Sequence, residues 1–431
     1  MSKAPAVPRF SQVFVIREFR MLWLAQLISV GGNQLARVAL AVLVFDRSAS
    51  AGLAALTYAL TLLPELVGGP MLSWLADRYP RRGLMVVCDL VRTGLVAVMA
   101  VPGTPLWLLC ALVVAVQLVQ SPHMAARAAL LPTIALGERY LAASAVVNLT
   151  AQLGQLAGFA AGGAVVAALG PSQALLVNAG TFTLSAVLTR FGLARRPRPR
   201  PSGPAPAGAR WSVITGGAGL VRADRRLRLL MAFGAVSGFY ACKEGLATPY
   251  AETLGEGPAG AGFLLAASPA GAVVGMLVIT RWVKPDRALK LLGPLAVASC
   301  AVLMLTPVSS GIAVTCVLWA ASGLFSAFQL PANAEYSLSV PDSERGKAFG
   351  LASASVRVAQ GAGISLAGLA TAVAPVPHVI AAFGAVGAAA SGLLAIRWSR
   401  MPPRVADSTG EPVRAPNRLT SRPPDLSKDL E

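Results

Sequence analysis

Ionisable side chains stand inside several long apolar runs of this sequence, at Arg37, Glu65, Lys243 and Glu244. A charged residue at the centre of a membrane-spanning helix costs about 2.5 to 3.5 kcal/mol on insertion scales, so such residues are functional candidates by default. Burial disfavours the charged form of a carboxyl group and can bring its titration near the working pH. We therefore expect Glu65 and Glu244 to be candidate proton carriers, with a fixed ion pair as the alternative.

The adjacent pair Lys243 and Glu244 must find partners of opposite sign. Consecutive helical residues are about 100° apart, so the two side chains cannot share one face, and at least one is expected to point into a cavity. The mid-run residues of opposite sign predict two bridges, Lys243 with Glu65 and Glu244 with Arg37. The remaining polar candidates inside apolar runs are Asn33, Gln34, Arg357 and Gln360.

The composition identifies the elements that carry these residues. Of the 431 residues, 55% are hydrophobic and 13% charged, whereas a soluble domain has about 25% charged residues. Runs of about 20 apolar residues can cross a bilayer as helices. Twelve are predicted, over 20–45, 52–75, 84–101, 105–129, 139–169, 172–192, 229–253, 259–283, 290–307, 311–335, 347–374 and 377–397. The first is too long for a signal peptide, so we expect no cleaved leader.

The positive charge follows the connections between the runs. The formal net charge is +18, which in a soluble protein would favour nucleic acid as a partner. Here the turn at 76–82 and the segment 193–228 are rich in arginine, whereas 102–105 and 170–172 carry no charge. Because Lys and Arg mark the cytoplasmic side, we expect a multi-pass cell-membrane protein with both termini in the cytoplasm and no nucleic-acid partner.

The chain also repeats itself. An offset of 209 residues aligns Pro122 with Pro331 and Pro132 with Pro341, and a Pro-rich linker separates the halves. We predict an all-α membrane protein of two pseudo-symmetric six-helix bundles, the arrangement of transporters that work by alternating access. The expected divisions are an N-terminus 1–19, a bundle 20–192, a linker 193–228, a bundle 229–398 and a disordered tail 399–431.

The turn between the second and third runs reads "SWLADRYPRRGLMVVCDL" over 73–90. It resembles motif A of the major facilitator superfamily, although Ser73 and Pro80 replace the two glycines of that motif. The matching residues are Asp77, Arg78, Arg81 and Arg82. The resemblance implies the twelve-helix fold of that family over the whole chain, and alternating-access transport.

The charges at this turn have two readings. Asp77 can face the positive end of the helix predicted from 347, near Gly346, and so latch the two halves together. Arg81 and Arg82 then fit a flexible turn exposed to anionic lipid headgroups. The alternative is a basic loop that only sets topology.

A second segment, "GQLAGFAAGG", resembles the antiporter motif of the same family, with Phe159 in place of its usual proline. Its glycines are Gly154, Gly158, Gly162 and Gly163. Small residues let helices approach closely, and the resemblance implies the helix at 259–283 as partner. Ordinary tight packing is the alternative. The basic motif of many proton-coupled drug exporters is absent from the fourth run. The segments "ERYLAAS" (138–144) and "RGKAFGLA" (345–352) look closest to the macrolide-efflux-like exporter branch.

Asp89 and Arg92 lie one turn apart, near the expected cytoplasmic end of the third helix, and predict a structural pair that supports the motif A turn. His123 is expected to cap the fourth helix. The five cysteines all fall inside apolar runs, and neither they nor the histidines have the spacing of metal ligands, so we expect no metal and no cofactor.

These features predict a secondary active transporter rather than an enzyme or a pore. Catalytic signatures such as H-E-x-x-H, G-x-S-x-G and G-x-x-x-x-G-K-[ST] are absent from the sequence. We expect a monomer that exports an amphiphilic small molecule, such as an antibiotic, drug or secondary metabolite, by proton antiport. A lipid or lysolipid translocator of the same fold is the alternative.

Overall fold

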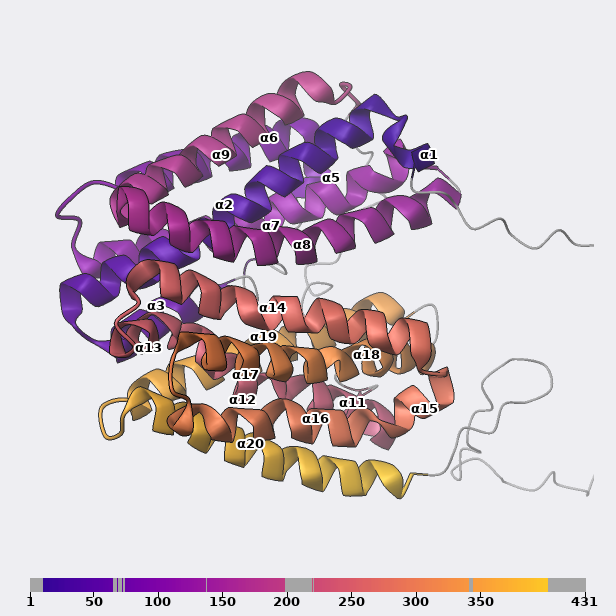
Figure 1. Ribbon diagram of the computed structural model, residues 1–431. Helices are drawn as coiled ribbons and strands as arrows, with labels where there is room; N and C mark the ends of the chain where they lie inside the picture. Colours follow the sequence, from indigo (N-terminus) through magenta and orange to yellow (C-terminus); the bar gives the residue numbers. More distant parts are fainter. Residues whose placement is uncertain are drawn as a thin grey trace, which may run out of the picture.

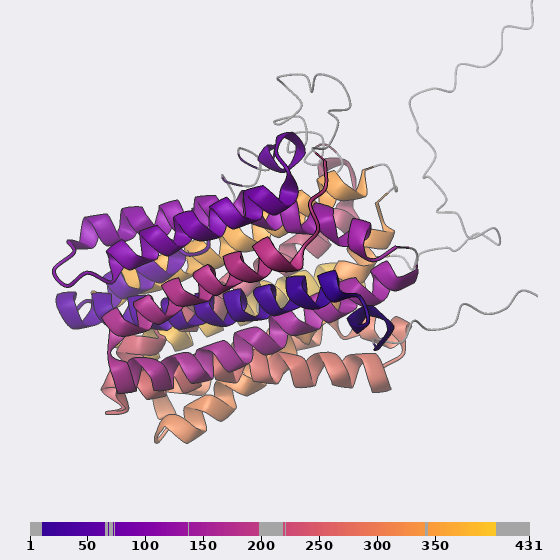
Figure 2. The same ribbon diagram turned by 90° about the horizontal axis from the view of Figure 1, so that it is seen from above.

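The protein is a bundle of roughly parallel helices in two stacked groups (Figure 1). The computed structural model describes residues 11–64, 68, 72, 74–136, 138–197, 219, 221–340 and 344–401. Within these residues there is no β-strand. Viewed from above, the helices of both groups again run lengthwise (Figure 2).

The N-terminal group packs around the long helix α2. Its helices are α1 (Ser11–Phe14), α2 (Arg17–Ser48), α3 (Ala51–Ala59), α5 (Leu75–Arg78), α6 (Arg81–Met99), α7 (Leu106–Ile134), α8 (Glu138–Leu169) and α9 (Pro171–Gly192). Helix α2 contacts α8 and α9, while α6 contacts α7 and α9. Local signals set the ends: the Ser50 side chain accepts a hydrogen bond from the Leu53 N–H and caps α3, and Pro171 opens α9.

The C-terminal group has more broken helices. They are α11 (Arg225–Ala235), α12 (Ser237–Gly245), α13 (Ala247–Thr253), α14 (Gly257–Trp282), α15 (Pro285–Lys290), α16 (Leu292–Ala301), η1 (Val302–Val308), α17 (Ile312–Phe325), η2 (Ser326–Phe328), α18 (Gln329–Leu338), α19 (Arg345–Ala370) and α20 (Val376–Ser399). Two breaks precede a proline by about one turn, at Leu246 before Pro249 and at η2 before Pro331. Proline clashes with the carbonyl four residues earlier, which explains both breaks.

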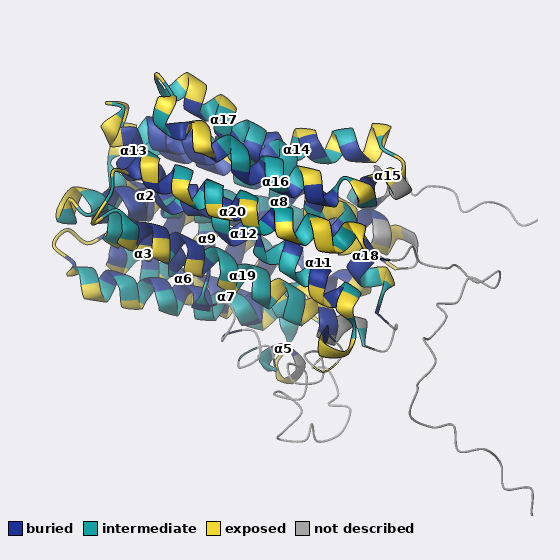
Figure 3. Cartoon of the chain, turned by 90° about the horizontal axis from the view of Figure 1, so that it is seen from below, coloured by how far each residue is buried: buried dark blue, intermediate teal, exposed yellow. Residues whose placement is uncertain are grey.

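Seven helices among the described residues are long and apolar enough to cross a membrane. They are Arg17–Ser48, Leu106–Ile134, Ala142–Leu169, Pro171–Gly192, Gly257–Trp282, Ile312–Ser339 and Val376–Ser399. Of the other five predicted runs, the one over 52–75 is described only in part and the remaining four fall on broken or more polar helices, so the number twelve stays a prediction. Figure 3 shows buried residues between the helices and exposed ones around the outside. Large apolar side chains such as Trp107 and Phe263 lie on that outer surface, as expected for a lipid-facing one.

The two ends of the bundle are distinguished by the helix ends and chain termini that lie there. We call the end where α1, the end of α9, the start of α11 and the end of α20 lie the tail end, and the opposite one the far end (Figure 1). Both termini of the described chain therefore leave from the same end, as the charge pattern predicts. The side of the membrane on which that end lies stays a prediction.

The two groups touch closely toward the far end. Helix α3 contacts α19, and α8 contacts α14. A Cβ atom added at Gly52 would lie 3.0 Å from the backbone oxygen of Gly368, and one added at Gly245 would lie 3.3 Å from the Cα atom of Ala55. The absence of side chains thus brings the backbones of the two halves together at this end.

Candidate functional site

A carboxylate, a phenol and a guanidinium meet where the two groups face each other. The Tyr58 hydroxyl, on α3, donates a hydrogen bond of 3.1 Å to Oε2 of Glu244, the last residue but one of α12. The guanidinium carbon of Arg37 on α2 lies 5.8 Å from the centre of the Tyr58 ring. These three side chains, which we call the bridge, connect the two halves of the chain.

The bridge modifies one sequence prediction. Arg37 and Glu244 do belong to the same interface, but the Tyr58 ring mediates between them, and no direct ion pair joins them among the described contacts. Sequence reasoning missed Tyr58 because a tyrosine in an apolar run is usually packing. Its available signal is the buried hydroxyl, which needs a partner in lipid.

Lys243 points in another direction from Glu244, as the helical period requires. It is fully buried, and its Nζ donates to the Tyr240 carbonyl at 2.7 Å and to the Ser322 hydroxyl at 3.3 Å. These partners place Lys243 inside the C-terminal group. Glu65 lies outside the described residues, so its predicted bridge to Lys243 stays a prediction.

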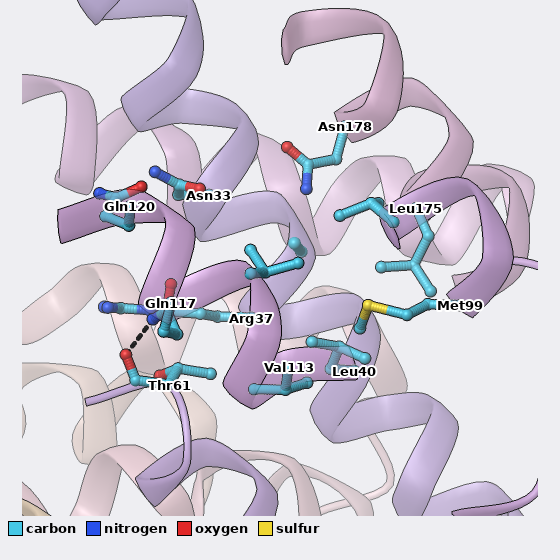
Figure 4. A pocket seen from close by; sticks show the side chains of 13 residues that line it. Asn33, Arg37, Leu40, Thr61, Met99, Val113, Gln117, Gln120, Leu175 and Asn178 are labelled. Carbon is cyan, nitrogen blue, oxygen red and sulfur yellow. Dashed lines mark hydrogen bonds between the residues drawn. The ribbon is translucent and has the colours of Figure 1, made fainter. Parts of the chain in front are cut away.

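Arg37 also lines a small cavity inside the N-terminal group (Figure 4). The cavity measures about 50 Å³, and its mixed lining includes the polar residues Asn33, Gln117, Gln120 and Asn178. Gln117 donates through Nε2 to the Thr61 carbonyl. The cavity is large enough for water, and amides on several helices offer hydrogen-bond partners. Gln34, by contrast, is buried against the glycine face of α8 at Gly158.

The predicted pair Asp89 and Arg92 is the centre of a buried polar network. Arg92 Nη1 lies 3.4 Å from Asp89 Oδ1, and both residues are fully buried. Ser185 on α9 donates to Asp89 Oδ2 at 2.7 Å, and His123 Nε2 on α7 lies 3.4 Å from Oδ1. Arg92 Nη2 donates to Asn33 Oδ1 at 2.8 Å. The network therefore ties α6 to α2, α7 and α9.

Two placements from the sequence are wrong here. Asp89 and Arg92 lie near the middle of α6, because that helix already begins at Arg81. His123 does not cap a helix, since α7 continues through Pro122 and Pro132 to Ile134. An interior proline removes one backbone hydrogen bond but does not always end a membrane helix.

The motif A arginines lie against helices of their own half. Arg81 Nη1 donates to the Ala129 carbonyl at 2.8 Å, and Arg82 Nη2 donates to the Arg190 carbonyl. The guanidinium carbon of Arg78 lies 5.7 Å from the Trp74 ring centre. Helix α6 starts at Arg81, so these two arginines lie in the first turn of a helix and not in a flexible turn, while their exposure to lipid headgroups stays a prediction.

The Asp77 side chain lies outside the described part, so the latch stays a prediction, and it is directly testable. Asp77→Asn removes the charge that the positive helix end attracts, a term of about 0.3 to 2 kcal/mol. We expect near-normal expression, cysteine labelling shifted toward the state open to the cytoplasm, and reduced export. Unchanged labelling together with unchanged export would remove the latch.

The four glycines of the antiporter-like segment do not share one partner. Added Cβ atoms at Gly154, Gly158 and Gly162 would lie 3.0 to 3.1 Å from atoms of α2. Only Gly163 faces α14, where its added Cβ would lie 2.6 Å from the Cα atom of Gly262. Helix α8 thus packs against the helix that the resemblance implied, through one glycine of the four.

The remaining polar candidates, Arg357 and Gln360, lie on α19. Arg357 lines a pocket of about 200 Å³ between α11, α18 and α19, together with Gln329 and Asn333. Gln360 is half-buried and directly precedes Gly361, whose backbone meets Leu63 of the other half. Both candidates therefore lie on the helix that contacts the N-terminal group.

The ion pair between Arg226 and Glu335 was not predicted from the sequence. Arg226 Nε lies 3.0 Å from Glu335 Oε1, and the Arg226 guanidinium stacks 5.2 Å from the Trp398 ring centre. Arg226 was assigned to the linker 193–228, but α11 begins at Arg225 with Asp224 as its cap. The seventh run therefore starts about one turn earlier than predicted. This pair joins α11 to α18 near the tail end.

The fold and the site define a multi-pass helical membrane protein with two halves that meet over buried polar side chains. The family model of the Major Facilitator Superfamily matches residues 22–334 and 245–426, well over half of the chain. The chain belongs to this superfamily and is a transporter of that class.

Relatives agree with this assignment. The uncharacterized MFS-type transporter YvqJ of Bacillus subtilis (strain 168) is 26% identical over 180 residues, which are 41% of this chain and 42% of that relative. Two solved structures share the fold, at 10 and 11% identity. One is a POT family transporter in complex with a thioalcohol-conjugated peptide, with a TM-score of 0.72 over 89% of this chain and 96% of that chain. The other is a bacterial homologue of the human lysosomal transporter Spinster, inward-facing and occupied, with a TM-score of 0.68 over 91% and 98%.

Proposed function

We propose that this transporter exports an amphiphilic small molecule, such as an antibiotic, drug or secondary metabolite, in exchange for protons. The observation that carries the proposal is the bridge, which puts one carboxylate, Glu244, at the contact between the halves with a phenol and a guanidinium beside it. A carboxylate at this depth is costly unless it is paired or protonated, so its protonation can favour one arrangement of the halves over the other.

The far-end contacts support an alternating-access cycle. Gly163 and Gly262 bring α8 against α14, and Gly52 and Gly368 bring α3 against α19. We infer that these contacts close the external side of an inward-facing state, with the tail end in the cytoplasm of a cell-membrane protein. The proposed export step then opens the far end and requires the glycine contacts to separate.

The substrate class follows from the polarity of the lining. The pocket between α11, α18 and α19 combines the amides Gln329 and Asn333 and the cation Arg357 with the apolar side chains Met231 and Phe349. Such a surface suits a molecule with one polar and one apolar part. The likeness in sequence to the macrolide-efflux-like branch points to the same class.

A lipid or lysolipid is the second candidate. A pocket of about 1130 Å³ at the far end is lined mainly by apolar residues of both halves, including Phe45, Leu56, Leu254 and Leu369. Such a pocket can hold an acyl chain. The pocket supports a lipid as substrate only if the acyl chain enters it through the gap between the two halves and not directly from the surrounding bilayer.

The test is accumulation of labelled drugs and labelled lysolipids in cells with and without the protein. We expect lower accumulation of at least one amphiphilic drug in expressing cells, and loss of this difference when a protonophore removes the proton gradient. A gradient of a cation other than the proton serves as the control, because it tests whether the proton gradient itself drives export. Equal drug accumulation with faster lysolipid movement would support the second candidate instead.

A further inference from the structure

The buried network in the N-terminal group contains an unused titratable group, the His123 imidazole. His123 is 6% exposed and Asp89 is fully buried. Asp89 Oδ1 has two neighbours at the same distance of 3.4 Å, Arg92 Nη1 and His123 Nε2. His123 Nε2 has no hydrogen-bond partner within the described part of the chain. The imidazole is therefore placed beside a carboxylate without a committed bond to it.

Arg92 divides its interactions between Asp89 and two neutral groups. Nη2 donates to Asn33 at 2.8 Å, and the guanidinium carbon lies 3.7 Å from the centre of the Phe182 ring. An aromatic face and an amide oxygen can hold a guanidinium without a carboxylate. Asp89 can thus be neutralised either by Arg92 or by a protonated His123 while Arg92 stays on Asn33 and Phe182.

We propose that Asp89 and His123 form a proton-binding site inside the N-terminal half, with Arg92 as the positioning residue that competes with the proton for the carboxylate. A proton from water binds the Nε2 lone pair of His123, and the imidazolium then donates to Asp89 Oδ1. Release reverses this step, with no other bond made or broken. The Asp89 carboxylate faces a cation in each form, Arg92 before the proton binds and the His123 imidazolium afterwards, when Asn33 and Phe182 hold the guanidinium.

The site is connected to the bridge through α2. Asn33, which holds Arg92, precedes Arg37 by one turn on that helix, and both line the 50 Å³ cavity with Gln117 and Gln120. A movement of α2 that shifts Arg37 at the interface also shifts Asn33. It thereby changes how strongly Arg92 binds Asp89 and how readily His123 takes a proton.

The charged and polar groups around the imidazole come from each packed helix. They are Asp89 and Arg92 on α6, Ser185 on α9, Asn33 on α2, which binds Arg92, and Arg127 one turn further along α7. The use of the site rests on the proposed proton coupling, whereas proton binding itself can be measured without any transported compound.

The sequence makes a direct test possible because it holds only two histidines, His123 and His378. Protein labelled with ¹⁵N-histidine and purified through a tag without histidine gives one set of imidazole signals for each. His378 is exposed near the start of α20, and His378→Asn assigns the spectrum. Spectra would be recorded from about pH 5 to about pH 8, the range in which a histidine can change its charge, and we expect the His123 signals to change across it.

Two variants separate the proposed site from a passive buried histidine. Asp89→Asn removes the charge that balances the imidazolium, so the protonated fraction of His123 should fall at any given pH. Asn33→Ala releases Arg92 to Asp89 and should act in the same direction. Asn178→Ala changes the same cavity without touching the network and should leave the titration as it is.

A His123 signal that stays constant across this pH range, or that titrates identically in Asp89→Asn, would overturn the proposal. Transport reports separately on the proposed function. If His123 responds to pH as described but export does not depend on the proton gradient, the proton-binding site is supported and proton antiport is excluded.

Discussion

Gly163→Val is expected to abolish transport while leaving the protein inserted in the membrane. A Cβ atom at this position would lie 2.6 Å from the Cα and 3.0 Å from the N of Gly262, and 3.0 Å from the Pro258 carbonyl oxygen. All three are backbone atoms that cannot rotate away. Overpacking costs about 1 to 3 kcal/mol. This strain destabilises only the state in which α8 and α14 touch, so the population of that state should fall by about 5- to 150-fold relative to the other states.

The matched control is Gly180→Val on α9, where an added Cβ meets no atom within 4 Å. Export of the drug found in the accumulation panel and cysteine labelling at the far end would be measured for both variants. We expect increased far-end labelling and little export for Gly163→Val, and normal behaviour for Gly180→Val. Normal export by Gly163→Val would show that the close α8–α14 contact is not part of the cycle.

The positions of the membrane helices could be predicted from the sequence because apolar runs, prolines and arginines act locally. The starts of α7 and α9 follow the uncharged turns at 102–105 and 170, and Asp89 with Arg92 follows from spacing on one helix. The errors were also local. The breaks before Pro249 and Pro331 are consequences of proline geometry, but the apolar runs that contain them continue without interruption.

The contacts between helices could not be predicted in this way. Tyr58 meets Glu244 across 186 residues, and His123 meets Asp89 from a different helix. Such contacts depend on how each helix is rotated about its axis. The apolar periodicity of the sequence defines this rotation poorly, because the faces that contact lipid and the faces that contact protein are both apolar. Of the four glycines that resemble the antiporter motif, the same rotation decides that Gly163 alone reaches α14.

Two substitutions at the hydrogen bond of the bridge are expected to affect transport differently, one by removing proton coupling and the other by slowing transport. Glu244→Gln keeps an oxygen that can accept the Tyr58 hydroxyl but cannot take up or release the proton. Uphill export should therefore fall to the equilibrium level, while exchange of labelled for unlabelled drug continues. Tyr58→Phe keeps the carboxylate and loses the hydrogen bond, which for a charged partner is worth about 1.5 to 3 kcal/mol.

We expect Tyr58→Phe to retain proton coupling but to slow transport by about 10- to 150-fold if the bridge forms only in the far-end-closed state. Proteoliposomes with and without an imposed pH gradient give both measurements for each variant. Arg37 supplies the remaining test, since its guanidinium carbon lies 5.8 Å from the centre of the Tyr58 ring, whose hydroxyl binds Glu244. Glu244→Ala leaves Arg37 without this carboxylate nearby and should reduce transport further than Glu244→Ala combined with Arg37→Leu. If the double variant inserts in the membrane but transports no better than the worse single variant, the guanidinium and the carboxylate act independently. If the Glu244→Gln variant still exports uphill, the transported proton binds to another group.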